Sequence, residues 1–493
     1  MRTVTTGKAI VGVLALSGFT PGCGADPASG GPGDEPGPGS TGGPGGGDTG
    51  GTGPGDPAPT EVTWSSRIAD IVQRNCVRCH ASGRFSTYSP LQTYDQVLDQ
   101  LAFLPAKLSF PPLIATQMPP YPGGAIPGRC EPRHAYSNDL RLGSADLEAF
   151  FQWIENDGPR GDAPYPAEPL QPAPPSLLAD TTEYPFAEGY VMTIDETHPT
   201  GHKDDWVCVV IDPGEIAGSR WFSGIQINPD ARQVFRGAVV WLDRARASLA
   251  YLQPDSPRTH GSSWYDCDDG FGFDGEILTG FLPEGEPFTT PPGTAVELPG
   301  DALLVVKLHY HAHYDHVNPT DTEPLPPVLT WPDHTSLSVQ WRDPGEATRA
   351  LALTIGDYAG PVADGTGNLT HPFEIPTGKP QSEMSGETMV ALVPGSAGDR
   401  YAVWAIHPEM QDAGRIVTVS VEDASSSECL AAVPRWDPTW QLPLMFDTTA
   451  GDAPLVSGGQ RLRIDCAYTN RTNSPLTLAD ESCRAMIGLV PAP

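Results

Sequence analysis

Hydrophobic positions follow a helical period near the N-terminus and a strand period further along the chain. Apolar side chains from Leu91 to Leu101 fall on one helical face, and those from Leu147 to Ile154 recur at i, i+3, i+4 and i+7. Ser144 precedes the second run as its predicted N-cap. The segment from Ile68 to His80 also begins as an amphipathic helix. These patterns predict a small all-α region before residue 163.

Short apolar runs alternate with turn residues in the larger, C-terminal part. The clearest runs lie at 206–211, 239–242, 302–310 and 415–421, and they are separated by Gly, Pro and Asp turns. Short strands with this punctuation fit one or two antiparallel sandwiches better than a wound parallel sheet. The sequence therefore predicts an all-β C-terminal part.

Composition and charge exclude several classes of protein. The 54 Gly and 55 Pro residues favour loop-rich β domains and exclude an all-helical chain. The 29 Lys and Arg residues against 61 Asp and Glu residues give a net charge of −32. Nucleic-acid binders and basic membrane-surface proteins use clustered cations, so we exclude both classes. The acidic surface would either steer a basic redox partner or keep the protein soluble.

The N-terminus carries an export signal and a linker. A charged start and a short apolar run over residues 1–23 are typical of a secretory signal peptide, and the run is too short for a permanent membrane span. Thr20 to Cys23 resembles the lipobox of bacterial lipoproteins, so we expect lipidation at Cys23; the alternative is an ordinary signal with an incidental cysteine. Residues 24–60 hold 15 Gly and 8 Pro, which predicts a disordered tether.

Cys76-Val-Arg-Cys79-His80 is the most specific motif in the chain. Two thiols at this spacing add to the two vinyl groups of haem, and the adjacent imidazole is delivered to the iron. A thioredoxin-like dithiol would need a βαβ context, and a zinc half-site would need a second cysteine pair. The motif therefore predicts covalent haem c at Cys76 and Cys79, with His80 as an axial ligand.

The second axial ligand is expected downstream of this motif. Met118, in Gln-Met-Pro-Pro, is the first candidate because the prolines would fix an extended loop, and His134 is the second. The alternative for Met118 is ordinary core packing. The order of helix, CxxCH motif, helix, methionine loop and final helix is that of a class I cytochrome c. Residues 61–162 resemble the cytochrome c-like domain of exported bacterial proteins.

The β part has a second resemblance, which is spread over several motifs in the same order. The segments Asp204–Cys208, Pro291–Pro299, Leu303–His311 and Cys466–Asn470 are similar to the copper type II ascorbate-dependent monooxygenases. That is the family of peptidylglycine α-hydroxylating monooxygenase and dopamine β-monooxygenase. The resemblance implies two jelly-roll domains, each contributing one copper across a solvent cleft. In that chemistry one copper binds oxygen and hydroxylates the substrate, while the other stores an electron.

The family's first copper site is largely lost in this chain. Arg236 and Gly237 stand where the family has a His-His pair, and only His309 is retained at the third position. Copper binds imidazole and thioether donors, so neither Arg236 nor Gly237 can replace the pair. The resemblance leaves His309 as a residual copper-type position.

The family's second copper site is replaced as well. Glu409 and Gln411 stand in place of a His-x-His pair, and Ser482 stands in place of a methionine directly before a cysteine. Hard oxygen donors by themselves would not hold copper. A slip of two residues would restore His407 as a ligand. We expect that five of the six family ligands are absent.

A histidine run after the retained ligand leaves an alternative open. His309, His311, His313 and His316 form His-x-His-x-His-x-x-His, and the first three would share one face of a strand. Such a face could chelate copper, zinc or nickel. In the other interpretation His309 is a remnant, His311 belongs to the family strand, and the rest are solvated loop residues.

The resemblance also implies two disulfides. Cys208–Cys267 would pin the first jelly roll and Cys466–Cys483 the second, and both suit an oxidising compartment. Cys130 and Cys429 have no partner assigned by the resemblance. A bridge between these two would lock the haem domain onto the β part.

These features predict a multidomain chain. Its parts are a signal peptide at 1–23, a linker at 24–60, a small all-α cytochrome c domain at 61–162, a proline-rich hinge at 163–184, and tandem all-β jelly-roll sandwiches at 185–335 and 336–493. We expect an exported lipoprotein of a Gram-negative bacterium, in the periplasm or at the outer membrane or cell surface, attached to the membrane by lipid only.

The predicted function is electron transfer through haem c, with a redox partner protein or a small electron donor or acceptor. Two alternatives stay open. One is an active copper-dependent monooxygenase that receives electrons from the fused haem. The other is a non-catalytic ligand- or partner-binding module with a redox-sensing haem.

Overall fold

The computed structural model describes most of the chain after residue 60. The described residues are 61–86, 89–108, 118–162, 164–174, 176–186, 190–195, 197, 202–214, 216, 218–259, 263–267, 273, 275–313, 328–356, 362–363, 369–370, 374–375, 382–384, 390–423, 426–477 and 482–492. The predicted signal peptide, Cys23, the linker and His316 lie outside these residues. Residues 61–493 form one compact unit. Within the described ranges no helix is long and apolar enough to span a bilayer.

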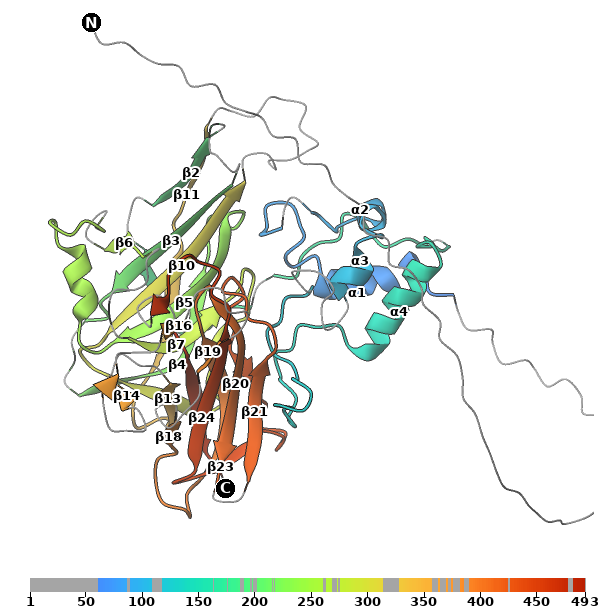
Figure 1. Ribbon diagram of the computed structural model, residues 1–493. Helices are drawn as coiled ribbons and strands as arrows, with labels where there is room; N and C mark the ends of the chain where they lie inside the picture. The colour runs from blue at the N-terminus through green and yellow to red at the C-terminus, as the bar shows by residue number, and fades with distance from the viewer. Residues whose placement is uncertain are drawn as a thin grey trace, which may run out of the picture. The chain divides into compact units, whose positions relative to one another are not determined.

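The α-helices in the described part of this unit lie in its N-terminal part, where the hydrophobic pattern predicted helices. Its elements are the short π-helix η1 (Trp64–Ile68) and the α-helices α1 (Ala69–Asn75), α2 (Tyr94–Asp99), α3 (Leu104–Leu108) and α4 (Ser144–Glu155), which gather in one group (Figure 1). The Thr63 side chain accepts a hydrogen bond from the Ser66 N–H and caps η1. This cap fixes the start of the helical part.

Two helix starts differ from those that the sequence predicted. α2 begins at Tyr94 rather than near Leu91, because Thr93 forms a capping box there. The predicted N-cap role of Ser144 was wrong, since Ser144 is the first residue of α4 and Gly143 is its N-cap. Apolar spacing does not fix helix boundaries to within one or two residues, so shifts of this size are expected.

Aromatic side chains hold the helices together. Trp64 of η1 and Trp153 of α4 are fully buried, with ring centroids 6.4 Å apart. Phe150 packs edge-on against Trp153 at 5.8 Å, and Ile71 and Val72 of α1 belong to the same cluster. Each large apolar side chain buried in this way contributes about 1.5–3 kcal/mol. The packing fixes the end of α1 from which Cys76 follows.

The rest of the unit is mostly β. The strands of its first half are β1 (Thr182–Pro185), β2 (Val191–Asp195), β3 (His202–Ile211), β4 (Ser219–Asn228), β5 (Phe235–Asp243), β6 (Trp264–Asp266), β7 (Glu276–Phe281), β8 (Phe288–Thr289), β9 (Thr294–Pro299), β10 (Leu303–His313), β11 (Val328–Pro332) and β12 (Ser336–Arg342). A 3₁₀ helix, η2 (Ala247–Leu252), follows β5.

The second half continues with shorter strands among longer ones. They are β13 (Thr348–Gly356), β14 (Val362–Ala363), β15 (Leu369–Thr370), β16 (Glu374–Ile375), β17 (Ser382–Met384), β18 (Val390–Leu392), β19 (Arg400–Glu409), β20 (Gly414–Glu422), β21 (Ser427–Val433), β22 (Leu444–Met445), β23 (Leu455–Ser457), β24 (Arg461–Tyr468), β25 (Leu476–Thr477) and β26 (Arg484–Pro491). All four strand runs predicted from the sequence lie on such strands: β3, β5, β10 and β20.

Three sheets carry most of these strands in the described part of the chain. Their orders are β6-β3-β10-β5-β7, then β17-β24-β20-β21 with β18 beside β24, and finally β1-β12-β4-β9-β13-β26-β19-β22 with β8 and β23 at its sides. Three separate two-stranded sheets are formed by β2–β11, β14–β15 and β16–β25. The pairings in the described ranges are antiparallel except for β9 with β13. The expectation of antiparallel β sandwiches is therefore met at the level of sheets.

The parallel pairing joins the two halves of the β region. Thr348 to Ala350 of β13 lie beside Thr294 to Val296 of β9, and β13 pairs with β26 on its other edge. One sheet therefore runs through both predicted jelly rolls. This continuity keeps the strands of the two halves in a fixed register with each other.

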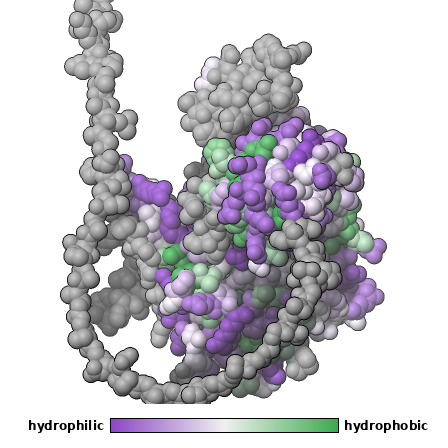
Figure 2. Space-filling view, turned by 90° about the vertical axis from the view of Figure 1, so that its right-hand side faces the viewer, coloured by the Kyte–Doolittle hydropathy of each residue, from purple (hydrophilic) through white to green (hydrophobic). Residues whose placement is uncertain are grey.

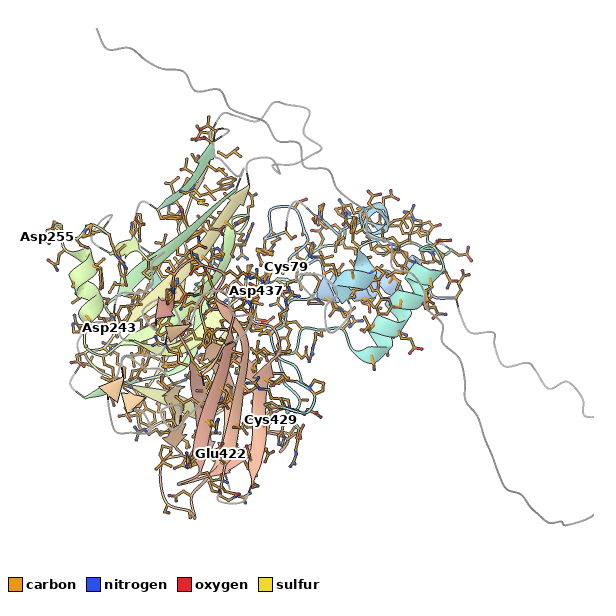
Figure 3. The ribbon with its side chains drawn as sticks, viewed as in Figure 1. Cys79, Asp243, Asp255, Glu422, Cys429 and Asp437 are labelled. Atoms are coloured by element: carbon orange, nitrogen blue, oxygen red, sulfur yellow. A yellow bond between two sulfur atoms is a disulfide. The ribbon has the colours of Figure 1, made fainter. Side chains whose placement is uncertain are left out.

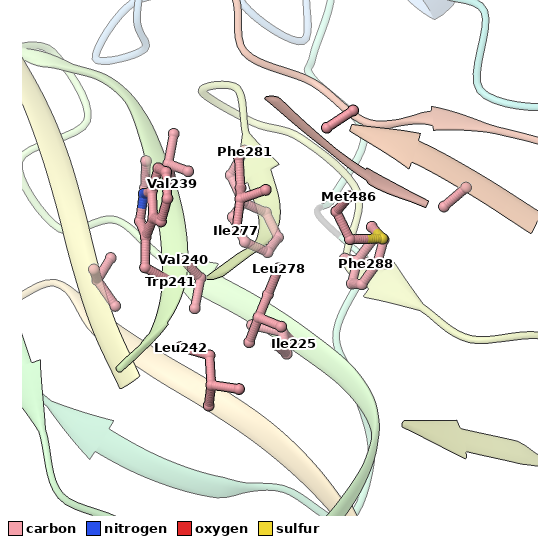
Figure 4. Packing of buried hydrophobic residues seen from close by; sticks show 14 of the residues in the cluster. Ile225, Val239, Val240, Trp241, Leu242, Ile277, Leu278, Phe281, Phe288 and Met486 are labelled. Carbon is pink, nitrogen blue, oxygen red and sulfur yellow. The ribbon is translucent and has the colours of Figure 1, made fainter. Parts of the chain in front are cut away.

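The β core is dense around β5 and β7. Every residue of β5 is buried, in agreement with the uninterrupted apolar run at 239–242. Figure 4 shows Trp241 and Val240 of β5 near Ile277 of β7, and Phe288 and Met486 belong to the same buried cluster. The molecular face in Figure 2 is mostly hydrophilic, as expected for an acidic chain.

Three disulfides cross-link the described part. Cys208–Cys267 and Cys466–Cys483 join the residues that the family resemblance paired. Cys130–Cys429 joins the two cysteines that were left over, and Cys429 is marked in Figure 3. The helical part and the β region are thus covalently linked across 299 residues of chain.

Removal of this long-range bridge is expected to weaken the fold. A cross-link over so long a loop restricts the unfolded chain and stabilises the folded state by about 2–4 kcal/mol. The Cys130→Ala/Cys429→Ala variant should show that loss in denaturant unfolding followed by tryptophan fluorescence. An unchanged free energy of unfolding would mean that the noncovalent contacts alone hold the helical part to the β region.

Candidate functional site

The two thiols and the imidazole of the CxxCH motif are brought together by a tight turn. α1 ends at Asn75, and the Cys76 N–H donates to the Val72 carbonyl at 2.9 Å. The His80 N–H then donates to the Cys76 carbonyl, also at 2.9 Å. The backbone therefore returns on itself within four residues of Cys76, and Cys79 (Figure 3) lies within this turn.

The ring of His80 is oriented by the backbone. Its Nδ1 lies 2.7 Å from the Ser89 carbonyl oxygen, and a carbonyl can only accept, so Nδ1 carries the proton. Within the described residues the Nε2 atom makes no hydrogen bond. Burial lowers the pKa of His80, and the hydrogen bond to Ser89 opposes that shift only in part. A neutral imidazole with a free Nε2 lone pair is the form that binds a metal.

Both thiols are unpaired and half-buried. Burial raises the pKa of Cys76 to about 12, and burial together with the Glu284 carboxylate does the same for Cys79. A redox-active dithiol needs a lowered pKa, so this environment does not suit thioredoxin-like chemistry. The residues fit haem attachment in both respects, with two free thiols and one oriented imidazole.

The two candidates for the second axial ligand have different surroundings. Met118 is half-buried, and its N–H donates to the Lys107 carbonyl at 2.8 Å, which returns the chain to the end of α3. His134 places its Nδ1 2.6 Å from the Asp452 carbonyl and its Nε2 3.7 Å from Glu428. His134 is therefore engaged with the β region, and Met118 stays the predicted ligand.

A turn of the β region covers the CxxCH motif. Residues 282–287, which we call the β7–β8 turn, contact the motif at two places. The Cys79 thiol lies 3.9 Å from the Pro283 carbonyl oxygen. Arg78 forms an ion pair with Glu286. The CxxCH motif is therefore in direct contact with the β region.

Glu284 lies at the centre of this turn between two arginines. Its Oε2 pairs with Arg84, which follows the motif, and with Arg232 of the β region at 2.6 Å. The carboxylate side chain is 4% exposed, so the ion pairs are buried rather than screened by water. The turn thus ties the segment after His80 to the β region by charge.

An aromatic contact lies beside this ionic one. Phe85 packs edge-on against Trp440, with ring centroids 5.6 Å apart, and the Arg236 guanidinium lies 4.4 Å from the Phe85 centroid. Asp437 (Figure 3) accepts hydrogen bonds from Thr439 and orders the turn that carries Trp440. These contacts were not foreseen from the sequence, because the residues lie far apart along it.

The residues that stand where the resemblance implies the first copper site lie next to each other. His309 of β10 stands opposite Gly237 of β5 in the ladder. A Cβ added at Gly237 would lie 2.9 Å from the Phe281 carbonyl oxygen, so the strand leaves no room there for an imidazole. Arg236, the neighbouring position, is buried and packs on Phe85.

His309 is held by an acid and an aromatic ring. Its Nε2 lies 2.8 Å from Oδ1 of Asp204, and its ring stacks on Trp206 with centroids 4.0 Å apart. The same Asp204 oxygen lies 2.8 Å from Nδ1 of His311. Burial alone would raise the pKa of Asp204, but the hydrogen bonds from both histidines outweigh it and hold that pKa below its usual range. The cluster is an imidazole–carboxylate–imidazole network.

The rest of the histidine run is only partly described. The backbone of His313 pairs with His202 in the β10–β3 ladder, and His316 lies outside the described residues. In the described ranges no group of three His, Cys, Asp or Glu side chains could hold a metal ion. Of the four histidines, only His309 and His311 are therefore seen to converge, on Asp204.

The residues at the second copper positions also converge. Gln411 donates to Oε1 of Glu409, and the Ser482 hydroxyl donates to Oε2 of the same carboxylate at 2.7 Å. Arg484 adds an ion pair to Glu409 at 3.2 Å. Glu409 is fully buried. A charge-neutral hydrogen-bonded network therefore stands where the resemblance placed copper ligands.

His407, two residues before Glu409, does not join this network. It is fully buried, and neither ring nitrogen has a hydrogen-bond partner. A Cβ on Gly280 would lie 2.6 Å from Cε1 of His407, so the imidazole packs directly on the β7 backbone. Burial lowers the pKa of His407 to about 3, which keeps the ring neutral.

Truncation of Glu409 is expected to destabilise the β region. Glu409 is fully buried, and Glu409→Ala would leave the Arg484 charge without its carboxylate partner. Removal of one partner from a buried ion pair lowers the free energy of unfolding by about 3 kcal/mol. Glu409→Gln removes the same charge but keeps the shape and one acceptor oxygen, so it should lose less. Chemical denaturation of both variants measures these losses, and the difference between them reports the shape and hydrogen bonding that glutamine retains. A Glu409→Ala variant as stable as the wild type would contradict the expected loss.

Comparisons with known proteins add no family. No protein-family profile matches the chain, and no curated protein matches it. The solved structures found include that of infectious bursal disease virus Gx strain, with 10% identity, 66% of this chain and 75% of that chain covered, and a TM-score of 0.17. The A223 turret protein of Sulfolobus turreted icosahedral virus has 10% identity, coverages of 61% and 100%, and a TM-score of 0.12. Likenesses at these scores carry no argument.

Proposed function

We propose that this chain is an exported haem c protein that transfers single electrons. The observation that carries the proposal is the arrangement around His80. The ring is fixed through Nδ1 by Ser89, and two unpaired thiols occupy the adjoining turn. Covalent haem attachment needs these features, and the dithiol alternative is disfavoured by the raised thiol pKa values.

Each residue of the motif has a distinct role in this proposal. Cys76 and Cys79 hold the porphyrin through thioether bonds, and Nε2 of His80 binds the iron. Met118 is the proposed second axial ligand, since its loop returns to α3. When bound, the haem supplies reversible one-electron chemistry. Cys76 packs against the buried cluster that contains Trp64 and Trp153.

The β region is proposed to be a copper monooxygenase-like fold that no longer holds copper. At the first site, Gly237 has no space for an imidazole and Arg236 packs on Phe85. At the second site, Glu409 is already engaged by Gln411 and Ser482. Both arrangements favour electron transfer over the hydroxylase alternative.

The proposed cellular location and electron partner follow from the sequence. We propose that the protein is lipidated at Cys23 and held away from its membrane by the linker at 24–60. Its net charge of −32 suits a basic redox protein as partner, although a small electron donor or acceptor would serve the same reaction.

The test is the metal content of the full chain. The protein is matured in a host with cytochrome c assembly, loaded with copper, dialysed and measured by elemental analysis, together with a pyridine haemochrome spectrum. The expected result is one iron per chain, a spectrum of haem with two thioether bonds, and no tightly held copper. Tightly bound copper would instead support the hydroxylase, and hydroxylation assays would follow.

A further inference from the structure

Glu284 is a charged residue in an unusual place. It belongs to the β7–β8 turn of the β region, and its backbone has a φ of 58°, which non-glycine residues rarely adopt. Its carboxylate is almost completely buried, with Oε2 shared by Arg84 and Arg232. The second oxygen, Oε1, is buried without a hydrogen bond. A carboxylate with one oxygen unsatisfied is costly to bury, which points to a role beyond stability.

The electrostatic reach of Glu284 includes the haem-attachment motif. The preceding residue, Pro283, places its carbonyl oxygen 3.9 Å from the Cys79 thiol. Arg84, its ion-pair partner, lies four positions after His80. The carboxylate is therefore close enough to act on charge at the Cys79 side of the proposed haem.

We propose that Glu284 is a positioning residue by which the β region sets the reduction potential of the haem. It holds Arg84 and Arg232 in place and contributes a fixed negative charge at the Cys79 edge. The inference rests on the proposed function and assigns to the β region a part in that same site. In this view the β region is a built-in electrostatic partner of the haem.

The direction of the effect follows from charge alone. Reduction adds one electron to the site and lowers its charge by one, and no bond forms or breaks. A nearby carboxylate favours the more positive, oxidised state, and it acts strongly because the surroundings are buried. Loss of its charge should therefore raise the potential, and loss of a neighbouring arginine charge should lower it.

The experiment is a redox titration of the full haem-loaded chain in the presence of a redox mediator, monitored by visible absorption. At a fixed ambient potential, Glu284→Gln should raise the ratio of reduced to oxidised protein about tenfold or more. A tenfold change corresponds to a rise of about 59 mV in the one-electron reduction potential. The matched control is Glu286→Gln, in the same turn, whose side chain pairs with Arg78 but is 55% exposed. Its shift should be less than threefold, because water screens the charge.

A second variant distinguishes the expected electrostatic effect from damage to the fold. Arg84→Gln should shift the ratio in the opposite direction from Glu284→Gln, and damage to the fold would not give opposite signs. Equal shifts for Glu284→Gln and Glu286→Gln, or shifts of the same sign for Glu284→Gln and Arg84→Gln, would overturn the inference. Failure of the proposed function itself is recognised separately, because the wild-type chain would then carry no iron and no haem spectrum.

Discussion

Replacement of both Cys76 and Cys79 by alanine is expected to abolish covalent haem completely. In the proposed function each thiol would supply one thioether bond, and Cys76 and Cys79 are the free cysteines of the described chain. Haem staining after denaturing electrophoresis should show a band for the wild type and none for the double variant. A single substitution should leave one thioether and a shifted haemochrome spectrum.

The control for this result is the variant that lacks the Cys130–Cys429 disulfide. Cys130→Ala/Cys429→Ala changes the same number of cysteines but leaves the motif intact. It should retain the haem band even if it is less stable. Haem that stays bound through denaturation in the Cys76→Ala/Cys79→Ala variant would refute attachment at these residues.

The second large effect is expected from His407 as the pH falls. An unfolded histidine takes up a proton near pH 6.5, whereas the folded chain holds the pKa of His407 at about 3. Between these values the unfolded state binds more protons, so stability falls as the pH is lowered through this window. The full loss from this residue amounts to about 4–5 kcal/mol, and above pH 6.5 the contribution is constant.

The measurement is the free energy of unfolding from pH 7 to pH 4 for the wild type and for His407→Leu. The variant should show a flatter dependence on pH whatever its absolute stability, since leucine does not titrate. His334→Leu is the matched control, because its side chain is 80% exposed and it should follow the wild type. Parallel curves for wild type and His407→Leu would contradict a buried neutral imidazole at this position.

The burial of His407 has a structural cause. The two halves of the β region meet through a common sheet, and their facing positions are filled rather than open to solvent. His407 packs on Gly280, and Arg484 lies over the Trp241 ring at 4.9 Å. The resemblance implied a solvent cleft between two coppers, but at these described positions side chains are buried against each other. The segment after the CxxCH motif, through Arg84 and Phe85, lies against the β region as well.

Much of the local structure could be predicted because it is encoded by near neighbours. The CxxCH spacing places two thiols and an imidazole within one turn, whatever the rest of the chain does. Apolar periodicity predicted helix α4 and strands β3, β5, β10 and β20, since each buries one continuous apolar run. Helix starts were less accurate, because they depend on single capping side chains such as Thr93.

The sequence by itself determined the chemistry available: the CxxCH motif, the cysteines, and the residues that stand where the resemblance expects histidine and methionine. Only the tertiary structure decided which distant residues act on that chemistry. Ser89 orients His80, the Glu284 carboxylate reaches Arg84 from 200 residues away, and Ser482 meets Glu409 across 73 residues. Such contacts depend on the register of strands far apart in the chain, and no local pattern of residues specifies that register.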